Sequence, residues 1–119
     1  MVKFAKILIM LIRALALVSI VLGVLIWTGN SPNLLGAHIG LGFTITLLIA
    51  LLTVLALVKR AFPIGILGVV AAVTLPWIGL RQFPLAFRHL GAIQVAHILV
   101  VVAGLGISES LYAAIRKTA

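Results

Sequence analysis

Cysteine is absent from the 119 residues of this chain. The absence excludes disulfides, thiolate zinc sites, iron–sulfur clusters and covalent haem attachment through a C-x-x-C-H motif. Any cofactor must therefore be held without covalent bonds to sulfur. The redox compartment stays open, because membrane helices need no disulfides.

Charged residues are also scarce. They make up 8% of the chain, against about 25% in an ordinary globular protein. Hydrophobic residues reach 65%, and so few polar groups cannot cover the surface of a soluble domain. The composition predicts an integral membrane protein with one domain, residues 1–119, and no domain outside the membrane.

Acidic residues are nearly missing. Glu109 is the one acidic residue, against nine Lys and Arg, and the formal net charge is +8. In a soluble chain this charge would suggest nucleic-acid binding. Here the basic residues sit mostly at the ends of hydrophobic runs and form no basic patch interleaved with aromatic residues. Such a pattern fits lipid headgroups, so the expected partner is the bilayer, with no nucleic acid.

Four long apolar runs are present, at about 7–27, 34–58, 64–80 and 92–115. At about 1.5 Å per residue each can cross a hydrocarbon core of about 30 Å. The predicted fold is all-α, an integral membrane four-helix bundle with up-down-up-down topology. Pro63 suits the first turn of the third helix, and Pro76 is expected to kink its outer end.

Basic residues predict the orientation of the bundle. With both termini on one side, that side carries Lys3, Lys6, Lys59, Arg60, Arg116 and Lys117. The other side carries Arg81 and Arg88. The positive-inside rule therefore predicts a multi-pass protein of the cell inner membrane with both termini in the cytoplasm.

Two histidines interrupt the second and fourth runs, His38 and His97. In an alternating bundle these helices run in the same direction, so both imidazoles are expected at one depth near the outer face. Ionisable residues inside a membrane are functional by default. A bare zinc or copper ion needs three or four protein ligands, whereas a porphyrin needs only one or two axial ligands. The pair therefore predicts one non-covalent b-type haem, with a structural or proton-handling pair as the alternative.

Four further residues are expected to belong to this site. Gly42 and Gly104 follow the histidines on the same helix faces and would give a macrocycle space, although they would equally serve close helix packing. Arg81 and Arg88 flank the last connection and would pair with the haem propionates. Contact with lipid headgroups is the alternative for both arginines.

Glu109 lies inside the fourth run, about two turns from its cytoplasmic end, and Arg13 lies at a similar distance inside the first run. Antiparallel helices bring the two to one depth, and an unpaired carboxylate there would be costly. We predict an Arg13–Glu109 pair, with Ser108 or Ser110 as further partners. The alternative is Arg13 reaching the headgroups and a protonated Glu109.

The arrangement of His38 and His97 resembles one half of haem A synthase, in which two four-helix bundles each carry histidines on their second and fourth helices. That family has a glutamate where this chain has Leu35, often an arginine where it has Ile39, and a cysteine pair in an outer loop. These departures mean that the resemblance does not extend to the family's reaction, the oxidation of a haem methyl group. The resemblance therefore implies a bundle that holds haem without modifying it.

The function expected from these residues is electron transfer by a small b-type cytochrome, alone or as a subunit of a larger membrane redox complex. Two protein ligands on iron disfavour substrate activation, so an enzymatic reaction is not expected. Self-association through a two-fold axis would reproduce an eight-helix arrangement. The alternative is a non-redox four-helix membrane protein, either a dimeric transporter that uses Glu109 or a structural subunit.

Overall fold

The computed structural model describes residues 1–29, 31–81 and 91–118. This part of the chain contains four α-helices and no strand, which confirms the predicted all-α class. The helices are α1 (Val2–Trp27), α2 (Leu35–Val58), α3 (Phe62–Arg81) and α4 (Ala92–Lys117), and a short 3-10 turn, η1 (Pro32–Leu34), precedes α2. The first helix begins earlier than its apolar run, because Lys3 and Lys6 are themselves good helix formers.

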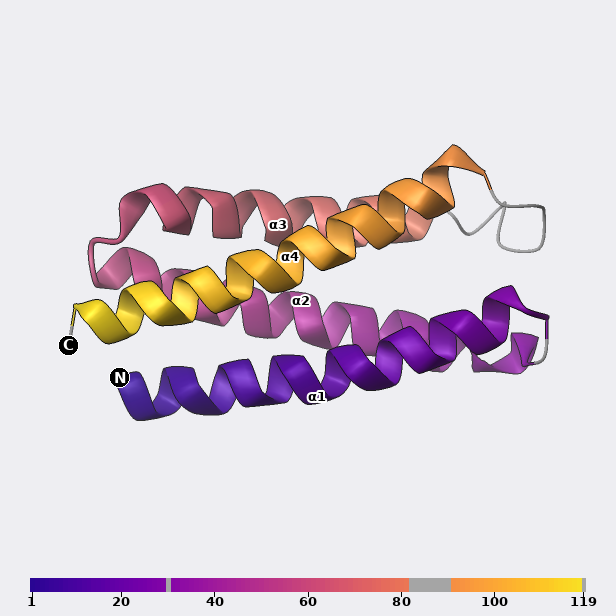
Figure 1. Ribbon diagram of the computed structural model, residues 1–119, viewed down its shortest axis with the longest axis horizontal. Helices are drawn as coiled ribbons and strands as arrows, with labels where there is room; N and C mark the ends of the chain where they lie inside the picture. Colours follow the sequence, from indigo (N-terminus) through magenta and orange to yellow (C-terminus); the bar gives the residue numbers. More distant parts are fainter. Residues whose placement is uncertain (30, 82–90, 119) are drawn as a thin grey trace.

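Successive helices run in opposite directions, and both termini lie at one end of the bundle, beside the α2–α3 turn (Figure 1). We call this the terminal end and the opposite one the far end. At the terminal end, Lys59 Nζ in the turn donates a hydrogen bond to the carbonyl of Thr118, at 3.4 Å. Pro63 lies in the first turn of α3, as predicted, and Pro76 lies within that helix.

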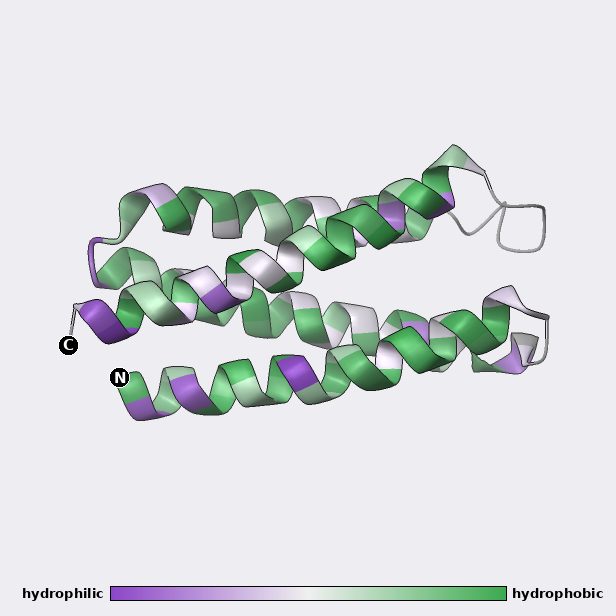
Figure 2. Ribbon diagram, viewed as in Figure 1, coloured by the Kyte–Doolittle hydropathy of each residue, from purple (hydrophilic) through white to green (hydrophobic). Residues whose placement is uncertain are grey.

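The four helices consist of apolar residues along most of their length (Figure 2). Each of the four helices is long and apolar enough to cross a membrane. The shortest, α3, has 20 residues, a length of about 30 Å that matches the hydrocarbon core. Large side chains such as Leu17, Leu47 and Leu99 are exposed. This surface is compatible with a multi-pass membrane protein, in which lipid would cover it.

The packed core lies in the half of the bundle near the termini. Its buried members come from α1, α2 and α4: Ala5, Leu8, Ile9, Ile12, Ile49, Leu52, Ala56, Leu111 and Ile115. On the α3 side, two buried glycines, Gly65 and Gly68, allow α3 to approach α2 closely. A side chain at Gly65 would overlap Leu57, and one at Gly68 would overlap Thr53.

A Gly68→Ala variant is expected to destabilise the bundle by about 1–3 kcal/mol, the usual cost of overpacking a filled core. The added methyl group would lie 2.9 Å from Thr53 Cγ2. Thr53 cannot easily move away, because its Oγ1 donates a buried hydrogen bond to the carbonyl of Ile49 at 2.8 Å. Denaturant or thermal unfolding of the purified protein in detergent measures the loss.

Gly106→Ala is the matched control for this experiment, because a Cβ at Gly106 in α4 would meet nothing within 4 Å. Its unfolding curve should match that of the wild type or move to higher stability, since alanine favours helix. Equal stability of the two alanine variants would contradict the close approach of α2 and α3.

Candidate cofactor site

The far half of the bundle is hollow. A cavity of about 480 Å³ lies between all four helices, within the range of about 300–1,000 Å³ typical of ligand and cofactor sites. Its wall is mostly aliphatic and aromatic, with four polar side chains among the described residues that line it: Ser19, His38, Gln94 and His97. An apolar cavity with a few convergent polar groups is the usual form of a binding site.

His38 on α2 and His97 on α4 face each other in this cavity. Their ring centroids are 6.4 Å apart, and the ring planes are inclined by 70°. Two imidazole nitrogens that bind opposite sides of one metal ion lie about 4 Å apart, since each bond to the metal is about 2.0–2.1 Å long. Ring centroids lie beyond the nitrogens, so a separation of 6.4 Å leaves space for one ion between the rings.

The His38 ring is held by α1. Its Nδ1 lies 3.0 Å from the carbonyl oxygen of Ser19 and 3.2 Å from Ser19 Oγ. A carbonyl can only accept, so this bond requires the proton on Nδ1 and leaves the lone pair on Nε2. Gly23, one turn further along α1, makes the approach possible, because a Cβ there would lie 3.2 Å from His38 Cε1.

The His97 ring packs in a similar way against α3 but is held less firmly. A Cβ at Gly79 would lie 3.5 Å from His97 Cε1 and 3.8 Å from Nδ1. Nδ1 is buried and has no hydrogen-bond partner among the described residues. Buried polar atoms without a partner are rare in native proteins and call for an explanation.

Ser19, Gly23 and Gly79 were not identified from the sequence. The signal available was the Ser19-x-x-x-Gly23 spacing, which places both residues on one face of a helix. Nothing in the sequence marked this face as the one that meets His38. Gly79 carried no signal beyond its place near the end of the third apolar run.

The two glycines predicted to give space have different surroundings. Gly42 lines the cavity, and a Cβ there would meet nothing within 4 Å. Gly104 is buried against α3, where a Cβ would lie 3.0 Å from Leu75 Cδ1, and it is not among the residues that line the cavity. Gly104 therefore serves helix packing, the alternative given above.

Arg81, one of the two predicted propionate partners, ends α3. Its guanidinium carbon lies 4.9 Å from the centre of the Trp77 ring, a cation–π contact. It does not belong to the wall of the cavity as the described residues define it. Arg88, the other predicted partner, and the neighbouring His89 lie outside the described residues.

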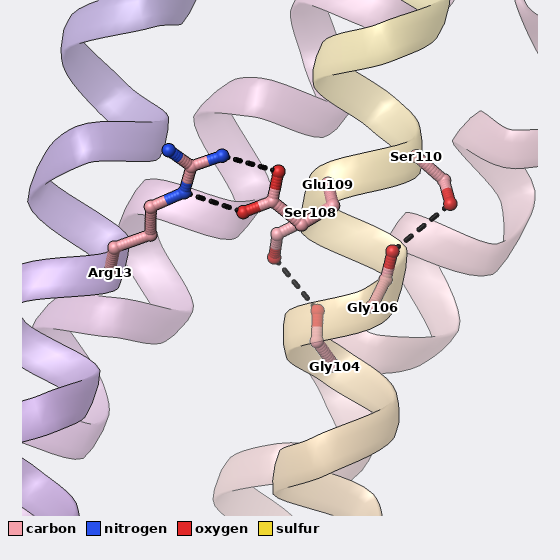
Figure 3. Close-up of polar contacts among 6 residues, drawn as sticks. All are labelled: Arg13, Gly104, Gly106, Ser108, Glu109 and Ser110. Atoms are coloured by element: carbon pink, nitrogen blue, oxygen red, sulfur yellow. Dashed lines mark hydrogen bonds and ion pairs between the residues drawn. The ribbon is translucent and has the colours of Figure 1, made fainter.

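The predicted Arg13–Glu109 pair is confirmed. Arg13 Nε and Nη2 donate to the two carboxylate oxygens of Glu109, both at 2.7 Å, a bidentate pair (Figure 3). The suggested serine partners are wrong. Ser108 Oγ donates to the carbonyl of Gly104 and Ser110 Oγ to that of Gly106, because a helical serine finds an acceptor one turn back along its own helix.

Arg13 and Glu109 line a second, smaller hollow of about 260 Å³ between α1 and α4. Ala16, Ile20 and Leu105 belong to its wall and also to the wall of the histidine cavity. The two hollows are therefore neighbours along the α1–α4 seam. The pair itself is on the outside of the bundle, with 58% of the Arg13 side chain and 46% of the Glu109 side chain exposed.

The side chains available as metal ligands indicate which kind of cofactor the cavity could hold. In the described part of the chain, no cluster of three or more His, Cys, Asp or Glu is available for a bare metal ion. Two facing imidazoles in an apolar cavity fit a metal that brings its own equatorial ligands, as haem iron does. His38 has its lone pair on Nε2 for such a bond.

Comparison with family models, with curated proteins and with solved structures found no match to this chain.

Proposed function

We propose that this chain is a membrane b-type cytochrome that holds one non-covalent haem between His38 and His97. The observation that carries the proposal is the separation of 6.4 Å between the two imidazole rings inside a cavity of about 480 Å³. The Ser19 carbonyl oxygen also supports it, because this oxygen lies 3.0 Å from His38 Nδ1 and fixes the tautomer of the ring. A histidine bound to a metal usually donates the hydrogen on its second ring nitrogen to an acceptor in this way.

The proposed role is electron transfer. Bound haem would supply a reversible ferric/ferrous couple, and the apolar wall would exclude water and so influence its potential. His38 and His97 would both be ligands of the iron, and two protein ligands would disfavour substrate activation there. The redox partner would be a soluble carrier or a neighbouring subunit of a larger membrane complex.

The same proposal includes insertion in a cell inner membrane with both termini in the cytoplasm. Support comes from the exposed apolar side chains and from the basic residues that gather at the terminal end, among them Lys3, Lys59 and Arg116. In this orientation the haem cavity would lie in the outer half of the bilayer. The positive-inside rule gives the direction.

The decisive test is the absorption spectrum of the full chain purified in detergent after haem-replete expression. We expect a Soret band, about one haem per chain, and a low-spin electron paramagnetic resonance signal typical of two imidazole ligands. Replacing both His38 and His97 with alanine should remove the signal. A correctly folded protein with no Soret band would overturn the proposal and favour a transporter or a structural subunit.

A further inference from the structure

The two histidines differ in how the protein holds the nitrogen that faces away from the site. Nδ1 of His38 has two oxygens of Ser19 within 3.2 Å. Nδ1 of His97 is buried and has no partner in the described parts of the chain. A partner on the outer nitrogen fixes the ring orientation and raises the basicity of the ligand, and its removal typically weakens metal binding about 10–100-fold.

From this difference we infer that His97 is the exchangeable ligand of the site and His38 the permanent one. The inference rests on the proposed function and goes beyond electron transfer. We expect the site to bind a small uncharged molecule such as carbon monoxide. This molecule would replace His97 as a ligand of the ferrous iron. In the exchange the bond from iron to the His97 nitrogen breaks, and a bond from iron to the carbon of the ligand forms. The iron stays ferrous, and no electron or proton is transferred.

The surroundings of His97 suit this exchange. On α4, Ile98 and Val101 line the cavity beside it, so the space offers apolar contacts to a small uncharged molecule and no hydrogen-bond donor from these two residues. Gly79 packs beside the outer edge of the ring but has no side chain that could hold it, and a Cβ built there would lie 3.5 Å from His97 Cε1. His38, by contrast, would have to give up the Ser19 carbonyl in order to move.

A serine at position 79 can supply the missing partner. The Cβ of a Gly79→Ser variant would lie in ordinary van der Waals contact with His97 and 3.8 Å from Nδ1. Its hydroxyl, one bond further, can then accept the Nδ1 hydrogen. Gly79→Ala adds the same Cβ without the hydroxyl and is therefore the matched control.

The experiment measures carbon monoxide binding to the dithionite-reduced, haem-loaded full chain by stopped flow, with absorption spectra of each variant. We expect the wild type and Gly79→Ala to bind carbon monoxide at a rate limited by release of His97. Gly79→Ser should bind it roughly tenfold more slowly, by analogy with the effect of a second-sphere partner on a metal ligand.

Two results would overturn the inference. One is an equal rate in the serine and alanine variants, and the other is a wild type that keeps its six-coordinate spectrum under saturating carbon monoxide. In both cases a Soret band recorded before reduction would still support the proposed function. Absence of that band from all three proteins would remove the proposed function itself, and the inference with it.

Discussion

A His38→Ala variant is expected to lose haem at least tenfold more readily than a His97→Ala variant. The expectation combines the Ser19 carbonyl at 3.0 Å from His38 Nδ1 with the lack of any described partner for His97 Nδ1. Since loss of a second-sphere partner alone weakens metal binding about 10–100-fold, loss of the better-supported ligand should cost more than this. Haem content per chain after purification, followed by titration with haem, measures the difference.

The His97→Ala protein should keep a haem on His38 and should accept added imidazole in the vacated position, with recovery of the low-spin spectrum. Circular dichroism provides the folding control for both variants, because the described packed core contains neither histidine. Equal haem retention by the two folded variants would contradict the unequal support of the ligands.

A Gly42→Leu variant is expected to bind haem roughly tenfold more weakly than the wild type, because overpacking typically costs about 1–3 kcal/mol and about 1.4 kcal/mol corresponds to tenfold in affinity. Gly42 lines the cavity four residues after His38, and no atom lies within 4 Å of a Cβ built there. A leucine side chain would therefore extend into space that the haem would use. Haem titration of the purified protein, followed at the Soret band, measures the effect.

Gly40→Leu is the control on the same helix. A Cβ at Gly40 also meets nothing within 4 Å, but Gly40 is not among the residues that line the cavity. Haem affinity should stay at the wild-type value in this variant. If both leucine variants bound haem as the wild type does, haem would have to lie elsewhere in the chain.

The sequence predicted the parts of the site that depend on topology. Four apolar runs with short connections imply antiparallel neighbours, so His38 and His97 on helices of the same direction had to lie at one level. The same reasoning predicted the contact between Arg13 and Glu109, which lie 96 positions apart in the sequence. Depth along a helix follows from counting residues, and counting needs no knowledge of packing.

Rotation of each helix about its own axis could not be predicted. Apolar residues occur on every side of these helices, so periodicity does not identify the face that points inward. This is why Gly104 was assigned to the site, although it packs against Leu75. The contacts of Ser19 and Gly23 with His38 depend on the rotation of both α1 and α2. Because periodicity does not show the inward face of either helix, these contacts could not be predicted.

The separation of the packed core from the cavity has a consequence for biogenesis. Because Ile12, Leu52 and Leu111 are fully buried near the terminal end without any contribution from the histidines, the bundle can assemble before a cofactor arrives. Newly made chains would then wait in the bilayer with an open far half and mature by capturing haem from the surrounding supply. Starvation for haem should accordingly leave an intact, colourless pool that gains colour after haem is restored, without new protein synthesis.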